Sequence, residues 1–366
     1  MERIRMGVIG CGEIAQIMHL PFLTELRDLF ELRAICDISP RLVETVGEIF
    51  HVPHRYIDYA ELLARDDLDA VAILTSDHAP VAIAAARAGK HIFVEKPMCF
   101  GVKEGRAIQA AAAERGIRLM VGYMKRYDPG YEYAQQLFRT MAGVRLIRVH
   151  DLTGRGPLAP QEIYSLYRAD DLPEATRARL QAETYAHLAE GLGLDRPDLV
   201  RAYGTMLGLS SHDITVLRGA FGDPLAVRYA EVSSGGQIVL AVLEYPDEMR
   251  CVWEIGNIPQ ATRSWFDEEL TVFGSAQTVT VRFPNPYVRY APTIVHVQEM
   301  DGAAQAERAV TASYDESFRR EWRHFYDCVT TGAMPRTGAA EGLRDVEILR
   351  AIVCCAADGT PVALGG

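Results

Sequence analysis

The sequence of 366 residues lacks any apolar run approaching the ~20 residues that cross a bilayer, and no signal-peptide core precedes its first glycines. It also lacks an excess of positive charge. With 38 basic and 49 acidic residues the net charge is −11, which repels phosphate backbones. We therefore expect neither a nucleic-acid nor a membrane partner. The seven cysteines have no disulfide-framework spacing, as expected in a reducing cytoplasm.

Several motifs that carry chemistry are missing as well. The histidines are scattered, with no HExxH pattern and no Cys/His pairing at ligand spacing, so we predict no metal site. There is no GxSxG nucleophile elbow, and Gly89-Lys90 lacks the upstream glycine of a phosphate-binding Walker loop. Internal repeats and low-complexity tracts are absent too, which leaves an ordinary globular chain of about two domains.

Residues 1–123 alternate short apolar runs with helical periods. Such alternation requires crossover connections and a parallel sheet covered on both faces, so we predict a doubly wound α/β domain of the Rossmann type. The expected strands are 4–9, 32–36, 70–74, 91–94 and 118–121, and the expected helices are 14–30, 41–50, 80–88 and 102–115.

Residues 124–366 show a different pattern, in which strand-like runs follow one another directly. They are predicted to form an α+β domain for substrate binding and oligomerisation. Consecutive strands joined by short turns indicate a large, open, mainly antiparallel sheet. A long polar and helical insertion spans about 157–205, and a C-terminal helix is placed to pack back on the first domain. The expected strands are 144–151, 225–232, 238–245, 250–255, 269–273 and 278–283.

A glycine-rich motif directly follows the first strand and opens a helix, which is the context of dinucleotide binding. Gly10 permits a tight turn, Gly12 lets the backbone approach a pyrophosphate, and Ala15 allows close helix–sheet packing. Glu13 and Ile14 complete the motif. The alternative is a pair of turn glycines without a ligand.

The second strand ends at Asp37, whose carboxylate can accept hydrogen bonds from both ribose hydroxyls. A 2′-phosphate would meet like charge there, so NAD is preferred over NADP. Arg41 weakens that preference, and the alternative for Asp37 is a helix cap.

Glu95-Lys96-Pro97 ends a parallel strand, where such sheets bind ligands. Together with the glycine motif it resembles the glucose–fructose oxidoreductase / inositol dehydrogenase (Gfo/Idh/MocA) family. The resemblance extends to the run 121–129, to Phe273-Gly274-Ser275 and to the segment from Ser317 to Arg336.

The resemblance implies that Lys96 contacts the reacting hydroxyl or carbonyl. It implies that Glu95 holds the cofactor ribose or Lys96, and that Pro97 follows a cis peptide bond. Thr75, Ser76 and His78 lie in the loop where the family has Thr-Pro-Asn-x-x-His, here two residues shorter; His78 alternatively caps the following helix.

The family's catalytic base lies in an Asp-x-x-x-His pattern. His212 matches the histidine, but Gly208 stands at the aspartate position and Thr215 at the usual acidic position beyond it. Asp213 points about 100° away from His212 on a helix, so it is no obvious substitute. An imidazole suits proton exchange near neutral pH, so we predict His212 as the base, against a structural histidine.

Further polar side chains are candidates for binding substrate hydroxyls or a carboxylate, although each can equally be a surface residue. They are Tyr123, Arg126, His150, Asp151, Arg155 and Tyr164. The insertion is interpreted as a substrate lid, an oligomer contact or a solvated helical pair on the sheet.

The sequence thus predicts a cytoplasmic NAD(P)-dependent oxidoreductase that acts on a secondary alcohol or ketone of a sugar, a polyol of inositol type or a sugar derivative. The resemblance implies a homodimer or homotetramer. Two alternatives stay open: a nucleotide-binding sensor or co-repressor without turnover, and a redox-cycling lyase or glycosidase with tightly held NAD.

Overall fold

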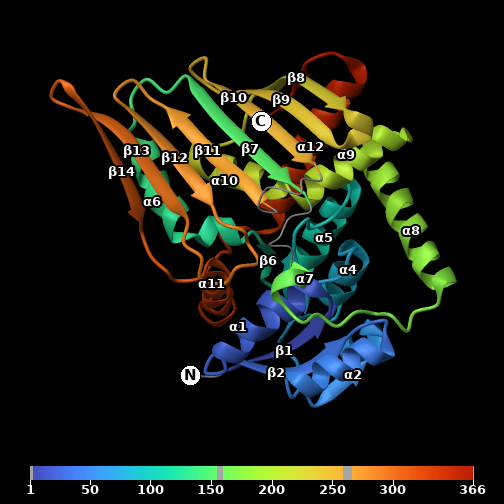
Figure 1. Ribbon diagram of the computed structural model, residues 1–366. Coiled ribbons are helices and arrows are strands. Elements are labelled where there is room, and N and C mark those ends of the chain that lie inside the picture. The colour runs from blue at the N-terminus through green and yellow to red at the C-terminus, as the bar shows by residue number, and fades with distance from the viewer. Residues whose placement is uncertain (1–2, 155–159, 259–265, 366) are drawn as a thin grey trace. The chain divides into compact units, whose positions relative to one another are not determined.

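The computed structural model describes residues 3–154, 160–258 and 266–365. The chain folds into two compact units (Figure 1). The first comprises Met1–Tyr123, Tyr164–Gly191 and Phe318–Val346, and the second comprises Met124–Ile163, Leu192–Ser317 and Glu347–Gly366. Residues 124–366 were predicted to form the second domain, whereas the segments Tyr164–Gly191 and Phe318–Val346 group with the first unit.

The first unit is built on a six-stranded parallel sheet in the order β3-β2-β1-β4-β5-β6. Its central strands are buried on both faces, as expected where helices cover a parallel sheet from both sides. The elements are β1 (Ile4–Ile9), η1 (Ala15–His19), α1 (Leu20–Glu25), β2 (Phe30–Cys36), α2 (Pro40–Ile49), β3 (His54–Tyr56), α3 (Tyr59–Leu63), β4 (Ala70–Ile73), α4 (Ala79–Arg87), β5 (His91–Glu95), α5 (Val102–Arg115) and β6 (Leu119–Gly122).

Local chemistry sets several of these boundaries. The Ser39 hydroxyl accepts the Leu42 N–H at the start of α2, and Gly116 ends α5 in a left-handed conformation. The expected helix over 14–30 was wrong in its extent. It is a π-helical turn followed by α1, because Pro21 has no N–H to continue a regular ladder, and Phe30 already belongs to β2.

The second unit contains a nine-stranded sheet in the order β14-β13-β12-β11-β7-β10-β9-β8-β15. All neighbouring strands are antiparallel except β7 and β10, so the predicted α+β class and the mainly antiparallel sheet are confirmed. The strands are β7 (Leu146–Thr153), β8 (Ala226–Ser233), β9 (Ile238–Glu244), β10 (Arg250–Asn257), β11 (Phe266–Phe273), β12 (Gln277–Phe283), β13 (Ile294–Asp301), β14 (Ala304–Thr311) and β15 (Val362–Ala363).

Helices α6 and α9 pack against strands of this sheet, and α10 packs against both helices. Asp128 accepts the Tyr131 N–H and so caps α6, while Pro129 takes the first helical position, where its missing N–H costs no bond. The later helical elements are η2 (Met124–Tyr127), α6 (Pro129–Thr140), α7 (Pro160–Ile163), α8 (Glu174–Leu192), α9 (Pro197–Gly208), α10 (Ser211–Phe221), η3 (Ser234–Gly236), α11 (Ser317–Thr331) and α12 (Ala339–Asp358).

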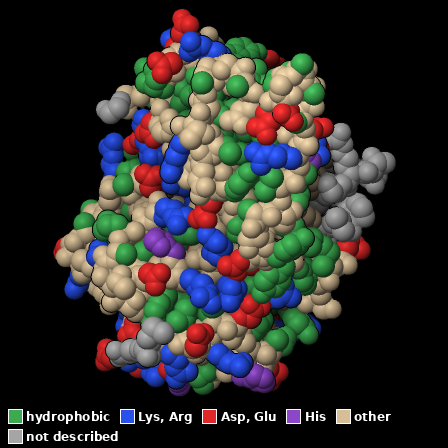
Figure 2. Space-filling model, turned by 90° about the vertical axis from the view of Figure 1, so that its left-hand side faces the viewer, with side chains coloured by type: hydrophobic (Ala, Val, Ile, Leu, Met, Phe, Trp, Pro, Cys, Tyr) green, Lys and Arg blue, Asp and Glu red, His purple; other side chains and the backbone are tan. Residues whose placement is uncertain are grey.

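On the face of the molecule in Figure 2, Lys and Arg side chains are interspersed with Asp and Glu, which gives that face a mixed charge. Within the described ranges, no helix combines the length and the apolar character that a membrane crossing requires.

Candidate active site

The glycine loop after β1 leaves its backbone accessible. Gly10 has a φ of +102°, and a Cβ there would lie 2.6 Å from the Leu74 carbonyl, so only glycine fits the turn. A Cβ on Gly12 would meet no atom within 4 Å. Ala15 is fully buried. Glu13 and Ile14 lie half-exposed just before η1. This combination fits the close approach of a pyrophosphate to Gly12.

Asp37 joins the loops that follow β1 and β2. Its Oδ2 accepts the Cys11 N–H at 2.9 Å, and its Oδ1 accepts the Ser39 N–H at 3.0 Å. Burial raises the pKa of Asp37 above its ordinary value, and these two N–H donors counteract the rise. Each carboxyl oxygen keeps a further lone pair for a ribose hydroxyl.

The loop Thr75–His78 is tied to the Lys96-Pro97 segment by a histidine. His78 Nδ1 lies 2.6 Å from the Pro97 carbonyl oxygen, which can only accept, so Nδ1 carries the proton. His78 stands at the N-cap position of α4, as the capping alternative expected, but its side chain makes no cap bond there. Burial lowers the pKa of His78, and its buried Nε2 has no hydrogen-bond partner within the described chain. Thr75 and Ser76 lie at least partly exposed in this loop.

Glu95 is buried, and both its oxygens are engaged inside the first unit. Trp322 Nε1 donates to His19 Nδ1 at 3.2 Å, which leaves His19 Nε2 to donate to Glu95 Oε1 at 2.9 Å. Glu95 Oε2 accepts the Lys96 N–H at 3.0 Å. Burial alone would raise the pKa of Glu95, but the bond from His19 and nearby positive charge lower it. These contacts favour the role of holding Lys96 over that of holding a ribose.

Lys96 itself is half-exposed at the end of β5, and the predicted cis bond between Lys96 and Pro97 is confirmed. His19 and Trp322 were missed by the sequence analysis. No motif marks either residue, and Trp322 comes from α11, more than 300 positions beyond His19, so no sequence signal pointed to them.

His212 lies in the second unit, on the first turn of α10, and is half-buried. Gly208 ends α9, and a Cβ on it would meet no atom within 4 Å, so the position of the family's aspartate has room for a side chain. Thr215 is fully buried, and its carbonyl oxygen accepts from Arg126 Nη1 at 3.0 Å. Arg126 is thereby fixed against α10.

Three carboxyl groups and one ammonium group are buried next to α10, a cluster that the sequence analysis missed. Lys125 pairs with Glu268, and Trp253 Nε1 donates to Asp213 Oδ2 at 3.2 Å. Burial raises the pKa of Asp213 well above its ordinary range, and the charges of Asp151 and Glu268 add to the rise. Burial would lower the pKa of Lys125, but these carboxylates raise it, so Lys125 stays charged.

The raised pKa of Asp213 predicts a pH-dependent loss of stability. A carboxyl that binds its proton more tightly in the folded chain contributes less to the free energy of unfolding as the pH rises above its unfolded pKa of about 3.9. Asparagine matches the protonated acid in shape and does not titrate. Asp213→Asn should therefore gain stability over the parent as the pH rises from about 4 to 8, measured by thermal unfolding followed by circular dichroism.

Glu268→Gln is the matched control, because it also removes one buried carboxylate but leaves the Lys125 ammonium without its counter-charge. It should destabilise the protein throughout the same pH range. Melting curves of Asp213→Asn that run parallel to those of the parent at every pH would show that Asp213 is charged in the folded protein.

The remaining predicted substrate residues lie in different environments. Tyr123 is fully buried. His150 and Asp151 are neighbours on β7 and so point to opposite faces of the sheet; His150 Nε2 lies 3.2 Å from Asp267 Oδ1, whereas Asp151 joins the buried cluster. Tyr164 is half-exposed beyond α7, and Arg155 lies outside the described residues.

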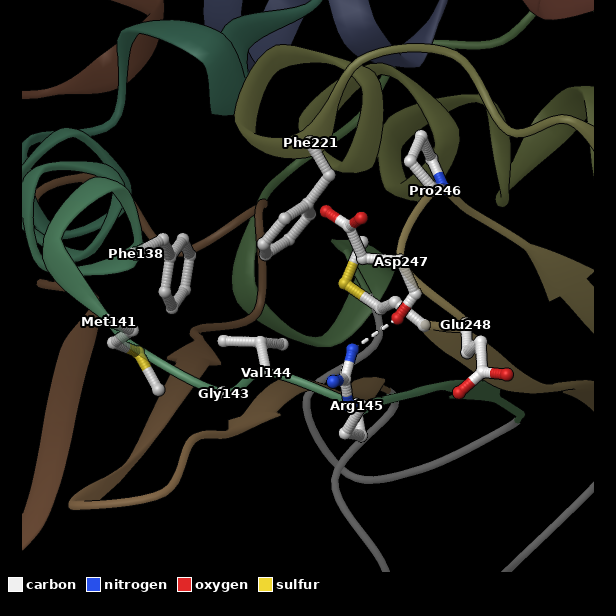
Figure 3. A pocket seen from close by; sticks show the side chains of 10 residues that line it. Phe138, Met141, Gly143, Val144, Arg145, Phe221, Pro246, Asp247 and Glu248 are labelled. Carbon is white, nitrogen blue, oxygen red and sulfur yellow. Dashed lines mark hydrogen bonds between the residues drawn. The ribbon is translucent and has the colours of Figure 1, made fainter.

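A cavity of about 640 Å³ lies in the second unit (Figure 3). The Phe138 and Phe221 side chains line it with Met141 and Met249, and Arg145 donates to the Asp247 carbonyl oxygen at its edge. None of the predicted site residues lines this cavity, so it is not part of the candidate active site. Among the described residues, no group of three or more His, Cys, Asp or Glu is arranged to hold a metal ion.

Comparison with known proteins points to the family that the sequence motifs resemble. Residues 4–123 match the family model described as an oxidoreductase family with an NAD-binding Rossmann fold. The chain is 27% identical over 255 residues to an inositol 2-dehydrogenase of Salmonella typhimurium, which covers 68% of this chain and 70% of the relative.

Two solved structures share the fold over almost the whole chain. One is a 3-ketoreductase from Actinomadura kijaniata in complex with NADP and TDP-benzene, with a TM-score of 0.73, 21% identity and coverage of 98% of both chains. The other is the WlbA dehydrogenase from Bordetella pertussis in complex with NADH and UDP-GlcNAcA, with a TM-score of 0.73, 20% identity and coverage of 100% of both chains.

Proposed function

The chain belongs to the Gfo/Idh/MocA oxidoreductase family, and on this premise we propose that it transfers a hydride between a nicotinamide cofactor and a secondary alcohol or ketone of a sugar, a polyol or a sugar derivative. The observation that carries the proposal is the fixed position of Lys96. Its backbone is held by Glu95, which is itself held by His19, at the C-terminal end of β5 in the sheet that carries the open glycine loop.

The residues of the first unit fit a bound dinucleotide. Gly10 makes the tight turn against Leu74, Gly12 leaves backbone open in the loop after β1, Asp37 offers lone pairs to a ribose, and the buried Nε2 of His78 is an acceptor. NAD, when bound, supplies the hydride acceptor. We propose NAD as the preferred cofactor because Asp37 directly follows β2 and Asp171 lies close enough to raise the pKa of Asp37 further. Two carboxyl groups therefore lie where a 2′-phosphate would add like charge.

Two side chains manage the proton in this proposal. Lys96 binds the substrate oxygen through its ammonium group and polarises it, and His212 accepts the hydroxyl proton in the oxidative direction. In the reductive direction His212 returns the proton to the carbonyl oxygen. Tyr123, Arg126, His150, Asp151, Arg155 and Tyr164 remain candidates for selecting the substrate, with Asp151 and His150 assigned to opposite faces of their strand.

One observation favours a sensor that binds nucleotide without turnover. Gly208 stands where the family has an aspartate beside its histidine, so His212 lacks that carboxylate. The retained Lys96 and His212 outweigh this argument, because a sensor needs neither an ammonium group nor an imidazole for proton transfer.

We extend the proposal to a cytoplasmic homo-oligomer. All seven cysteines are free thiols, as suits a reducing compartment. The more exposed face of the large sheet carries four large apolar side chains, which are 37–50% exposed and suit contact with a second copy. They are Leu146, Tyr229, Leu240 and Phe273.

The test is absorbance at 340 nm, with NAD⁺ or NADP⁺ and a panel of polyols, aldoses, sugar acids and glycosides. We expect NADH to form with one class of polyol or sugar, and faster than NADPH. Protein that binds NAD⁺ by titration but forms no NADH across the panel would favour the sensor. Turnover of a glycoside without net NADH would instead favour the redox-cycling lyase or glycosidase.

A further inference from the structure

A segment of the predicted insertion, residues 164–191, belongs to the first unit and is here called the strap. Figure 1 shows it as an extended stretch that leads into the long helix α8. Its first anchor is Tyr167. The Tyr167 N–H donates to Gln16 Oε1 at 3.0 Å, and Gln16 Nε2 donates to the Tyr167 carbonyl oxygen at 2.9 Å. Gln16 directly follows the glycine motif.

The second anchor is the carboxylate of Asp171. Its Oδ1 accepts the Ser39 hydroxyl, and its Oδ2 accepts the Arg41 N–H at 3.1 Å. Ser39 caps α2 and is fully buried, while Asp171 is exposed. The bonds from Ser39 and Arg41 lower the pKa of Asp171, so it is ionised at neutral pH.

Two further anchors fix the end of the strap. His187 Nδ1 lies 2.7 Å from Asp77 Oδ2, and this bond raises the pKa of His187. At Gly191 the strap touches main chain: a Cβ there would lie 2.1 Å from the Phe100 carbonyl oxygen, and a Cβ on Gly101 would lie 2.8 Å from the Gly191 Cα. The close approach therefore needs glycine on both sides.

The four anchors follow β1, β2, β4 and β5 in turn. They all lie at the carboxyl ends of parallel strands, which is the edge where such sheets bind ligands. A helical pair that merely covered the sheet would contact its helices or strand faces. The strap instead contacts the segments that follow these strands, at Arg41 and at direct neighbours in sequence of the predicted cofactor residues Ala15 and His78.

We propose that the strap is a cofactor-specificity element, in which Asp171 disfavours NADP by holding a carboxylate at the N-terminus of α2. In this class of fold the residues that follow the second strand face the adenosine ribose, and a nearby arginine accommodates a 2′-phosphate. Helix N-termini also bind phosphate through free N–H groups. Ser39 and Arg41 are the donors available here, and Asp171 occupies both.

NAD and NADP differ only at the 2′-position of the adenosine ribose, which carries a hydroxyl group in NAD and a phosphate in NADP. The 2′-hydroxyl of NAD is neutral and can donate to a carboxylate, so it is compatible with Asp37 and Asp171. The 2′-phosphate of NADP would meet both negative charges and would have to displace Asp171 to reach Ser39 and Arg41. The inference rests on the proposed use of a nicotinamide cofactor and names the residue that selects it.

The test compares the binding of NADH and NADPH to Asp171→Asn and to the parent, by nicotinamide fluorescence and calorimetry rather than by turnover. We expect NADPH affinity to rise about tenfold or more while NADH affinity stays within about threefold. Asp170→Asn is the matched control, because it removes the same charge from the neighbouring, exposed residue. It should leave the ratio of the two affinities unchanged.

A double variant tests whether the gain in NADPH affinity depends on Arg41. Adding Arg41→Ala to Asp171→Asn should remove most of the gain in NADPH affinity, since the 2′-phosphate would then lack the Arg41 guanidinium group as a counter-charge. An unchanged ratio in Asp171→Asn, or an equal loss of both affinities, would overturn the inference and leave the strap a structural brace, with the proposed dehydrogenase intact. A parent protein that binds neither dinucleotide would overturn the proposed function as well.

Discussion

Replacing Lys96 with alanine is expected to lower kcat by about 10³-fold while leaving the dissociation constant for NAD⁺ within a few-fold. The reason is positional. Lys96 directly follows β5, and its N–H is held by Glu95 while its side chain is half-exposed, so the fold fixes the backbone at the point where the proposal assigns the ammonium group to the substrate. Losing that group removes the charge that polarises the reacting oxygen. Steady-state kinetics at saturating NAD⁺ and a separate binding titration measure the two quantities.

Lys103→Ala is the matched control, because Lys103 is a lysine of the same unit whose side chain is 93% exposed. It should leave kcat unchanged. A Lys96→Ala protein that turns over normally but has lost NAD⁺ affinity would assign the lysine to the cofactor instead. Lys96→Arg separates charge from geometry: it keeps the positive charge but carries it on a longer, planar guanidinium group, so it should recover binding of the substrate better than it recovers the rate.

The parallel sheet could be predicted from sequence because its central strands are short, mostly apolar runs between helical periods. β1 lies at the expected residues, and α5 begins and ends where the pattern and Gly116 place it. Elements without that contrast were missed. β3 has only three residues, and β14 is an exposed edge strand, so neither shows an apolar period.

In the candidate site, too, residues that belong to a local sequence motif were predicted and residues held by distant contacts were missed. Glycine motifs and Lys96 are local in sequence, so their context identified them. The residues that hold them are far away in sequence: Trp322 fixes the His19 tautomer, and Asp171 reaches Ser39 across 132 positions. Contacts between residues so far apart in sequence depend on the tertiary structure. The buried group of Lys125, Asp213 and Glu268 was missed for that reason, although Asp213 directly follows His212 in the chain.

Replacing His212 with alanine is expected to lower kcat/KM by about 10²–10⁴-fold if its imidazole is the general base. His212 is half-buried on the first turn of α10, where the following residues are locked into the interior, so the helix position is well defined. The acid limb of the pH–rate profile should also disappear in the variant, because that limb reports protonation of the base in the free enzyme. Near-normal turnover across pH would remove the base assignment. His54→Ala, which changes an exposed histidine, is the control.

A substitution at Gly208 gives an independent test of His212 as the general base, because it is expected to raise the rate instead of lowering it. A Cβ at this position meets no atom within 4 Å, and aspartate there restores the Asp-x-x-x-His pattern that the family resemblance implies and that this chain lacks. If His212 is the base, Gly208→Asp should raise kcat in the parent, because a carboxylate orients the imidazole and stabilises its protonated form. The same substitution should have no effect when His212 is alanine. An equal effect in both backgrounds would mean that the carboxylate acts on the fold or the substrate, and His212 would then be a structural histidine.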